Sequence, residues 1–412
     1  MNVTGLRAEG VYKVFGRRPG EAVKRLRAGV SRDEVRQWGT AAVIDASFEV
    51  RSGETFVVMG LSGSGKSTLI RMLNGLWRPT AGQIWLGDDD LSAVSSAQLR
   101  ELRRRRVSMV FQHFALLPHR TVIDNAAYPL EIQGVDRGER RRRAGEALEL
   151  VGLGQWADSL PSQLSGGMRQ RVGLARALAA DTDVLLMDEA FSALDPLIRR
   201  EMQDQLLELQ QTLGKTIVFI THDLNEAMYL GDRIAVMRDG RIVQVGTSEQ
   251  ILSEPANDYV AQFVADVDRT RVLTAGSVMR RPAAVVQLSG GPRLALRTMR
   301  DHQVAAAYVV DRTRVLRGVV RDADAVAAVR AGKVETLDSL LDVSVPTVSV
   351  DTPLAEVFAP SAETPLPLPV TDDAGRLVGV VPRVTLLEAM VPPGVTTGET
   401  PVVPVDDMEV AR

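Results

Sequence analysis

The chain has 412 residues, enough for two or three domains, and its 45% hydrophobic and 25% charged residues are the composition of an ordinary globular protein. A formal net charge of −3 gives no general attraction to nucleic acid or anionic membranes, and the absence of cysteine excludes disulfides and thiolate metal sites. No apolar run approaches the roughly 18 residues needed to span a bilayer, and residues 1–10 lack the apolar core of a signal peptide. We therefore expect a cytosolic protein.

Residues 1 to about 268 alternate short apolar runs with helical patterns, which is typical of an α/β sheet. The strand candidates are 55–59, 107–111, 184–188, 216–220 and 233–237. Residues 17–42 are a predicted helical insertion, in which the capping box Ser31-Arg32-Asp33-Glu34 predicts the start of a short helix. Its seven basic and three acidic residues favour a solvated helical face, with a docking surface as the alternative.

The segment Gly60-Leu61-Ser62-Gly63-Ser64-Gly65-Lys66-Ser67-Thr68 carries the most specific signal in the chain. It fits the pattern of Gly, four residues and Gly-Lys-Ser/Thr, and it lies between an apolar run and a helical pattern. A glycine-rich turn at this place directs backbone N–H groups and the positive end of a helix at one point, where phosphate oxygens fit. Lys66 would then reach the outer phosphates, and Ser67 would offer its hydroxyl to Mg²⁺.

Residues 164–171, Leu-Ser-Gly-Gly-Met-Arg-Gln-Arg, predict a second helix start that is suited to an anion. One nucleotide does not need two such sites from a single chain. Two chains that face each other head to tail would place one site on each side of each nucleotide.

The apolar run 184–187 ends in two carboxylates, Asp188 and Glu189. A buried strand that delivers an aspartate beside a phosphate-binding loop suits Mg²⁺. Glu189 would then lie where a water molecule can attack the γ-phosphate, which is the position of a general base or a water-orienting group.

Residues 272–391 contain a weak internal repeat. Val309-Val310-Asp311 and the following Leu316–Val320 recur as Val370-Thr371-Asp372 and Leu377–Val381. Each copy predicts a strand, a polar turn, a second strand and a helix, and two copies that are too small to bury a core alone predict one paired domain. Residues 392–412 are rich in Pro, Gly, Thr and acidic residues, so we expect them to be disordered.

Taken together, residues 1–268 resemble the nucleotide-binding subunit of an ATP-binding cassette (ABC) transporter. Five elements occur in the family's order: the phosphate loop 60–68, Gln112, the signature sequence 164–168, the loop Ser192-Ala193-Leu194-Asp195, and His222. The resemblance implies that Gln112 joins Mg²⁺ and the transmembrane partner, that residues 192–195 cross a dimer interface, and that His222 senses the γ-phosphate. Met168 stands where Gln is commonest, yet Ser165 and the following N–H groups can still hold phosphate.

The resemblance also implies a complete set of site residues. The catalytic residues would be Glu189, His222 and Gln112, and the metal ligands Ser67, Gln112 and Asp188. ATP would contact Phe15, Gly60, Ser62, Gly63, Ser64, Gly65, Lys66, Ser67, Thr68, Ser165, Gly166, Gly167 and Asp195. Phe15 falls where the family stacks an aromatic ring on adenine; a core position is the alternative.

The closer resemblance is to the ATPase subunit of glycine betaine/proline importers, the quaternary amine uptake systems. It rests on residues 11–16, 59–62, 109–119, 164–177 and 187–199. The repeat at 272–391 resembles the tandem CBS domains that this family commonly carries. Here Arg321 replaces a Thr before Asp324, and the second copy has Pro382 and Thr385 with no acidic group. These departures favour a packing or dimerisation module over a nucleotide site.

We therefore expect an ABC-type P-loop domain at 1–268 with a helical subdomain at about 113–165, followed by an α+β tandem CBS domain. The resemblance implies a homodimer on the cytoplasmic face of the inner (plasma) membrane that hydrolyses ATP on integral-membrane permease subunits. It would drive uptake of glycine betaine, proline or a related amine, which an extracytoplasmic solute-binding protein supplies indirectly.

Two alternatives stay open. One is the ATPase subunit of an importer for another small solute, such as an amino acid. The other is a soluble non-transport cassette ATPase, although the chain has one cassette and no long coiled arms. The arginine runs 103–106 and 140–143 lack interleaved aromatic residues, so we expect solvated helix faces and no nucleic-acid partner. Anionic lipid headgroups are a minor candidate for these runs.

Overall fold

The computed structural model describes residues 4–112, 115–192, 194–265, 267–332 and 336–391. The chain divides into two compact units, with the boundary between Val260 and Ala261. The sequence-based boundary at residue 268 falls inside the second of these units. The predicted tail, 392–412, lies outside the described residues.

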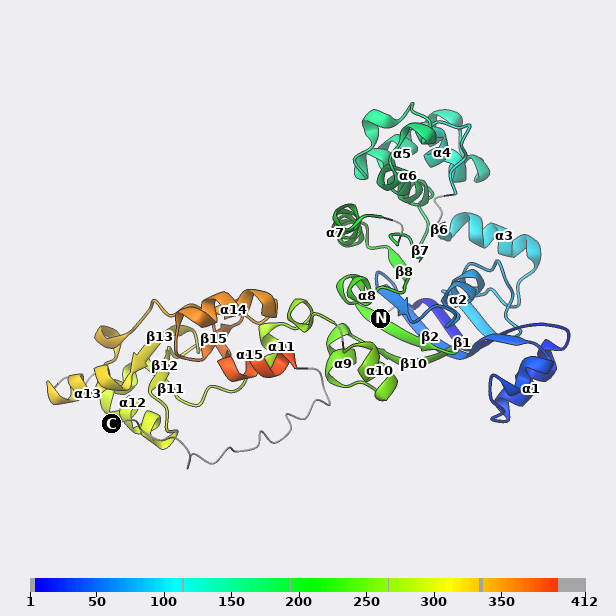
Figure 1. Ribbon diagram of the computed structural model, residues 1–412. Coiled ribbons are helices and arrows are strands. Elements are labelled where there is room, and N and C mark those ends of the chain that lie inside the picture. Colours follow the sequence, from blue (N-terminus) through cyan, green and yellow to red (C-terminus); the bar gives the residue numbers. More distant parts are fainter. Residues whose placement is uncertain (1–3, 113–114, 193, 266, 333–335, 392–412) are drawn as a thin grey trace, which may run out of the picture. The chain divides into compact units, whose positions relative to one another are not determined.

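A six-stranded sheet with the order β10-β9-β3-β8-β7-β6 forms the centre of the first unit (Figure 1). Its strands are β3 (Thr55–Met59), β6 (Val107–Val110), β7 (Val184–Asp188), β8 (Thr216–Thr221), β9 (Arg233–Arg238) and β10 (Arg241–Gly246). Strands β9 to β6 pair in parallel, whereas β10 is antiparallel to β9. Every residue of β3, β7 and β8 is buried, as expected for parallel strands at the centre of an α/β sheet. The five predicted strands are confirmed within one residue.

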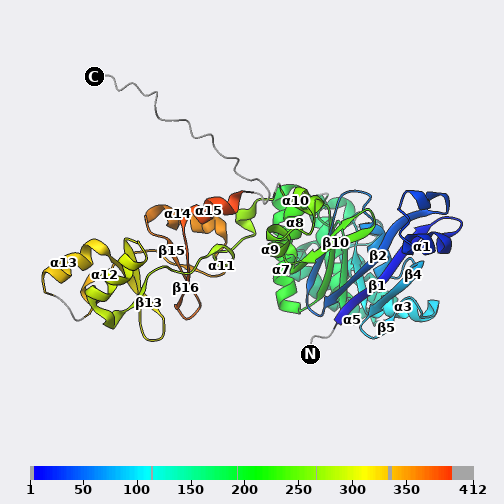
Figure 2. The same cartoon turned by 90° about the horizontal axis from the view of Figure 1, so that it is seen from below.

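A second, antiparallel sheet of the same unit has the order β2-β1-β4-β5. It consists of β1 (Thr4–Phe15), β2 (Thr40–Arg51), β4 (Ala81–Leu86) and β5 (Asp89–Asp90). Helix α1 (Pro19–Arg27) in the insertion lies beside β1 (Figure 2). It buries Ala22, Val23 and Leu26 in a small core with side chains of β1 and β2. The insertion is thus folded onto this sheet by an apolar face.

The capping box in the insertion forms, but it does not start an α-helix. The Ser31 N–H donates to Glu34 Oε2 at 2.9 Å, and the Glu34 N–H donates to Ser31 Oγ at 3.3 Å. These bonds lead into the four-residue 3-10 helix η1 (Glu34–Gln37). Little room is left for a longer helix, because Gly39 packs against the Phe15 backbone and β2 begins at the next residue. The predicted short helix is therefore confirmed, as a single 3-10 turn.

Helices α4 (Val122–Ile132), α5 (Arg137–Leu150) and α6 (Gly166–Ala179) pack against one another as a separate group (Figure 1). Asn125 of α4 is fully buried at the entrance to this group. Its amide oxygen accepts from the Leu117 N–H at 2.7 Å, and its amide nitrogen lies 3.0 Å from the carbonyl oxygens of Leu117, Arg120 and Thr121. One side chain thus fixes the loop that leads into the helical group.

The first unit has eight further helical elements among its described residues. They are α2 (Lys66–Leu73), α3 (Ser96–Arg105), η2 (Gly154–Trp156), η3 (Pro161–Gln163), α7 (Pro196–Leu213), α8 (Leu224–Leu230), α9 (Ser248–Ser253) and α10 (Asp258–Phe263), which reaches into the second unit. The two arginine runs, 103–106 and 140–143, lie at the end of α3 and in α5. Several of their guanidinium groups form ion pairs. These pairs are Arg104–Glu101, Arg106–Asp89, Arg106–Asp183, Arg141–Asp158 and Arg142–Glu139.

The second unit contains two small sheets of equal topology, β11-β12-β13 and β14-β15-β16. In each, the first pairing is parallel and the second antiparallel, which confirms the predicted internal repeat. The first copy comprises α11 (Ala275–Val278), β11 (Val285–Gln287), η5 (Leu288–Gly290), α12 (Gly291–Asp301), β12 (Ala306–Val310), β13 (Leu316–Arg321), α13 (Asp322–Arg330) and η6 (Asp338–Leu340), with η4 (Arg269–Arg271) before it. The second comprises β14 (Val348–Ser349), α14 (Leu354–Glu363), β15 (Leu368–Thr371), β16 (Leu377–Val381) and α15 (Arg383–Met390). A shared core that includes Tyr308, Val319 and Leu377 joins the copies.

Removal of the Asn125 amide should destabilise the helical group. Asn125→Ala removes the acceptor of the half-buried Leu117 N–H, and a buried donor left without a partner costs about 1–3 kcal/mol of unfolding free energy. We expect the first unfolding transition of the full chain in urea to move to lower concentration. Asn225→Ala is the control, because Asn225 is an exposed asparagine of α8. An unchanged midpoint for Asn125→Ala would contradict the assigned role.

Candidate functional site

The phosphate loop, residues 60–68, joins β3 to α2 through glycines whose backbone conformations strain any other residue. Gly60, Gly63 and Gly65 have φ angles of 153°, 78° and 107°, which L side chains rarely adopt. A Cβ atom on Gly60 would lie 2.1 Å from the Met237 carbonyl oxygen, and one on Gly65 would lie 2.3 Å from that of Ala42. Close backbone packing therefore fixes the loop at the N-terminus of α2, where N–H groups attract anions.

The Lys66 side chain lies back over this loop. It is only 4% exposed, and its Nζ donates to the carbonyl oxygens of Gly60 at 2.7 Å and Leu61 at 3.2 Å. Burial lowers the pKa of Lys66, and the negative charges of Glu189 and Asp188 oppose that shift. A cationic group with few polar partners is thus held next to the predicted phosphate position.

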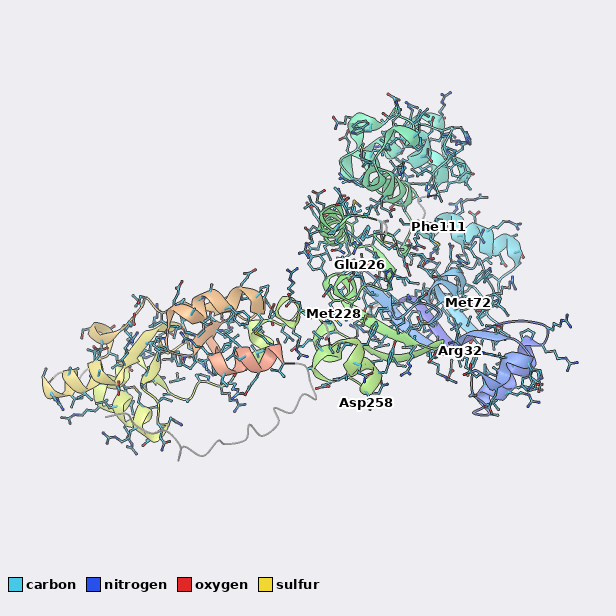
Figure 3. The ribbon with its side chains drawn as sticks, viewed as in Figure 1. Arg32, Met72, Phe111, Glu226, Met228 and Asp258 are labelled. Carbon is cyan, nitrogen blue, oxygen red and sulfur yellow. The ribbon has the colours of Figure 1, made fainter. Side chains whose placement is uncertain are left out.

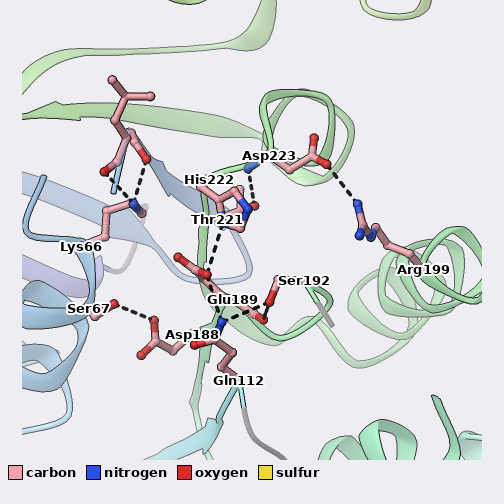
Figure 4. Close-up of polar contacts among 12 residues, drawn as sticks. Lys66, Ser67, Gln112, Asp188, Glu189, Ser192, Arg199, Thr221, His222 and Asp223 are labelled. Atoms are coloured by element: carbon pink, nitrogen blue, oxygen red, sulfur yellow. Dashed lines mark hydrogen bonds and ion pairs between the residues drawn. The ribbon is translucent and has the colours of Figure 1, made fainter. Parts of the chain in front are cut away.

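Asp188, at the end of β7, meets the first turn of α2. The Ser67 hydroxyl donates to Asp188 Oδ1 at 3.3 Å, and burial raises the pKa of this carboxyl group (Figure 4). The structure thus brings together two of the predicted Mg²⁺ ligands. No group of three or more His, Cys, Asp or Glu side chains suited to a metal occurs among the described residues. Mg²⁺ fits nonetheless, because it usually takes one or two carboxylates together with phosphate oxygens and water.

Two polar side chains contact Glu189, and they come from the ends of the strands on either side of β7. Its Oε2 lies 3.3 Å from the donor Nε2 of Gln112, after β6, and 3.2 Å from Nδ1 of His222, after β8 (Figure 4). Its backbone has φ = 47°, a left-handed conformation that costs a non-glycine residue about 1–3 kcal/mol. We call Gln112, Asp188, Glu189 and His222 the strand-end cluster. The sequence predicted all four.

The loop 192–195, which we call the interface loop, adjoins this cluster. Ser192 Oγ donates to the Glu189 carbonyl oxygen at 2.9 Å and lies 3.4 Å from Gln112 Nε2. Asp195 caps α7, since its Oδ1 accepts from the Ile198 N–H at 3.1 Å. Ala193 lies outside the described residues. Ser192 belongs to the sequence motif but was not predicted as a site residue, because its contact with Gln112 is visible only in the structure.

The signature sequence begins α6 in the helical group. Ser165 caps this helix by accepting the Met168 N–H at 3.3 Å. Gly166 and Gly167 form the first turn, and a Cβ atom on Gly167 would lie 2.6 Å from the Ile198 side chain of α7. The glycine therefore permits α6 and α7 to pack closely at the base of the interface loop.

Phe15 ends β1 with a ring that is 40% exposed. Its ring packs edge-on against Trp77, with centroids 5.1 Å apart, and Lys13 Nζ lies 5.2 Å from it. Arg71 lies over Trp77 at 4.9 Å. Phe15 is thus a surface aromatic residue, and the core alternative is wrong. Sequence reasoning missed Trp77, because its contact with Phe15 joins residues far apart in the chain.

Comparison with known families identifies both parts of the chain. Residues 43–192 match the ABC transporter family, and residues 275–331 and 339–392 each match the CBS domain. No helix in the described ranges has the length and apolar character required to cross a membrane.

Three curated relatives are similar over nearly the whole chain. The glycine betaine transport ATP-binding protein of Bacillus subtilis is 50% identical over 93% of this chain and 92% of its own length. The glycine betaine/carnitine transport ATP-binding protein of Listeria monocytogenes is 50% identical over 93% and 97%. The glycine betaine/proline betaine transport system ATP-binding protein of Escherichia coli is 46% identical over 95% and 99%.

Solved structures resemble the first part of the chain. An ATP-binding cassette dimer in a post-hydrolysis state with ADP and Pi aligns with a TM-score of 0.51 and 30% identity, over 59% of this chain and 98% of that one. A dimeric bacterial ABC transporter cassette aligns with a TM-score of 0.50 and 31% identity over the same shares. The likeness supports the cassette fold of the first unit.

Glu189→Gln should separate nucleotide binding from turnover. Glutamine keeps the shape of the side chain but removes the charge that can orient or deprotonate water, so we expect ATP hydrolysis to fall by about 10²–10⁴-fold. ATP binding, measured by calorimetry, should persist. Glu9→Gln is a control for charge removal at an exposed position. Near-normal turnover of Glu189→Gln would rule out this carboxylate as the hydrolytic group.

Proposed function

Because this chain belongs to the family of ATP-binding subunits of glycine betaine ABC transporters, we propose that it hydrolyses ATP to drive uptake of glycine betaine or a related quaternary amine. The observation that carries the proposal is the convergence of Gln112 and His222 on Glu189 beside the Lys66 loop. A base, a γ-phosphate sensor and a phosphate cradle are the parts that phosphoryl transfer to water needs.

We assign the phosphate contacts to the phosphate loop. The N–H groups of residues 60–68 hold the α- and β-phosphates, and Lys66 exchanges its contacts with Gly60 and Leu61 for phosphate oxygens. Its low exposure supports this role, because a buried ammonium gains more from an anion than an exposed one. Phe15 stacks on the adenine, and Trp77 keeps the Phe15 ring in place by edge-on packing.

Glu189 acts on the attacking water in this proposal. Its carboxylate accepts a proton from the water or orients it, while His222 and Gln112 hold the carboxylate from two sides. Ser67, Asp188 and Gln112 would hold Mg²⁺, which would supply positive charge to offset that of the phosphates. The contact between Ser67 and Asp188 supports this assignment, since both are hard oxygen ligands on adjacent elements.

We further propose that two copies of the chain form a head-to-tail dimer on integral-membrane permease subunits at the cytoplasmic face of the plasma membrane. Ser165, Gly166, Gly167 and Asp195 of one copy would then complete the nucleotide site of the other. The N-terminus of α6, with its cap and two glycines, supports this role because it can accept an anion from outside. An extracytoplasmic binding protein would deliver the solute to the permease.

In domain terms, we propose that the residues up to about 260 form the nucleotide-binding domain, with the insertion 17–42 and a helical subdomain that starts at about 113 and includes α6. The pair 272–391 would be a regulatory module, because the phosphate-handling motifs all lie before it. An ATPase for an amino acid importer is the second candidate, and uptake of labelled solutes decides between the two.

Composite sites can be tested with two mixed dimers. In the first, one chain carries Lys66→Ala and its partner Ser165→Arg. In the second, one chain carries both substitutions and its partner is wild type. In a head-to-tail dimer the first arrangement places both defects in one site and leaves the other intact, whereas the second damages both. We expect ATPase activity in the first dimer only. Activity confined to the second would show that each chain hydrolyses ATP by itself.

Uptake by the reconstituted membrane complex tests the solute. We expect ATP-dependent accumulation of radiolabelled glycine betaine, with competition by proline betaine or carnitine, and none in a complex that contains Glu189→Gln. The Glu189→Gln complex is the matched control, since it should still bind ATP. Accumulation of an amino acid in place of the quaternary amines would favour the second candidate.

A further inference from the structure

Two helices of the first unit start directly at functional loops. Helix α7 begins after the interface loop, at Pro196, and α8 begins two residues after His222. The Arg199 guanidinium group of α7 contacts both starting points, and Figure 4 shows its contact with Asp223. One of its terminal nitrogens donates to the Leu194 carbonyl oxygen at 3.2 Å, and the other donates to Asp223 Oδ2 at 3.2 Å.

Asp223 fixes the turn that carries His222. Its second oxygen caps α8 by accepting the Glu226 N–H at 3.1 Å, and its own N–H donates to Thr221 Oγ1 at 2.9 Å. Asp223, which follows His222, is therefore hydrogen-bonded to Thr221, to the first turn of α8 and to Arg199. A displacement of Asp223 would change the position of His222 relative to Glu189.

A second contact lies one turn further along both helices. Gln203 Nε2 donates to Glu226 Oε1 at 3.1 Å, and both side chains are buried. Figure 3 marks Glu226 on α8. Because Gln203 follows Arg199 by four residues and Glu226 follows Asp223 by three, the two pairs lie on the facing sides of α7 and α8. This pair keeps the helices in register, so Arg199 can connect their first turns.

We propose that Arg199 is a positioning residue that couples the interface loop to His222 and thereby sets the rate of ATP hydrolysis. The inference rests on the function proposed above and adds a residue to which the sequence motifs assign no role. A planar guanidinium group can hold a carbonyl and a carboxylate in fixed directions, which a single ammonium group cannot. Movement of the interface loop, which faces the partner subunit in the proposed dimer, would thus change the position of His222 relative to Glu189.

The surroundings of the pair favour this role over a purely stabilising one. The side chains of Arg199 and Asp223 are 28% and 33% exposed. Ion pairs at such positions contribute little to the free energy of unfolding, about 1 kcal/mol or less. A small error in the placement of a group at the reacting atoms can instead cost about 100-fold in rate. Loss of Arg199 should therefore affect turnover more than stability.

The test compares Arg199→Gln with Arg200→Gln in the full-length chain. Arg200 is a matched control because it is the next arginine of α7 and pairs with Asp204 and the Tyr229 ring, away from both loops. For Arg199→Gln we expect kcat to fall about 10- to 100-fold, with ATP affinity by calorimetry and the melting temperature as in the control. The cooperativity of hydrolysis with respect to ATP concentration should also decrease.

Two further variants separate positioning from charge. Arg199→Lys keeps a cation near Asp223 but lacks the rigid planar fork that orients both partners, so its kcat should lie between those of Arg199→Gln and wild type. Asp223→Asn retains the helix cap and removes the ion pair, and the double variant with Arg199→Gln should be no slower than Arg199→Gln alone. Equal kcat in Arg199→Gln and Arg200→Gln, or independent effects in the double variant, would overturn the inference. A wild-type chain that hydrolyses no ATP would overturn the proposed function as well.

Discussion

The parallel pairing of β3, β8, β7 and β6 is the constraint on which the rest of the site depends. Parallel strands end at one edge of a sheet, and here Gln112, Asp188, Glu189 and His222 lie at or just after the ends of three of them. The phosphate loop follows the fourth, β3. No single segment of the chain contains this combination of an amide, two carboxylates, an imidazole and an anion cradle. Strand order brings Gln112 and His222 within hydrogen-bonding distance of Glu189, and Ser67 within that of Asp188.

Burial shifts the pKa values of charged side chains at this edge of the sheet. Lys66 and Asp188 are both buried, so the pKa of the first is lowered and that of the second is raised, while each opposes the other's shift through its charge. The site thus holds opposite charges with few polar partners of their own. Such charges interact strongly with a bound ligand, because surrounding water screens them poorly. Glu189 combines a strained backbone, with φ = 47°, with a carboxylate that contacts both Gln112 and His222.

Contacts among helices α6, α7 and α8 connect the loops that surround the site. Helix α7 packs on α6 through Gly167 and Ile198, and it contacts α8 through Arg199 and Gln203. A few contacts within one chain therefore join three places: the start of α6, the start of the interface loop and the start of the turn at His222. In the proposed dimer these starts face the partner, which gives a physical route from one nucleotide site to the next. The two CBS copies of the second unit share a core of their own.

The sequence by itself determined the phosphate loop, the five central strands, the internal repeat and the membership of the strand-end cluster. These features depend on local chemistry: positive φ angles that require glycine, apolar runs that require burial, and polar residues at the ends of those runs. The tertiary structure decided what the local pattern leaves open. The capping box at Ser31 forms, yet packing at Gly39 limits the following turn to four residues. Phe15 contacts Trp77, and Arg199 contacts Leu194 and Asp223. Strand order and helix packing bring these distant segments together. Periodicity along the chain cannot predict such contacts.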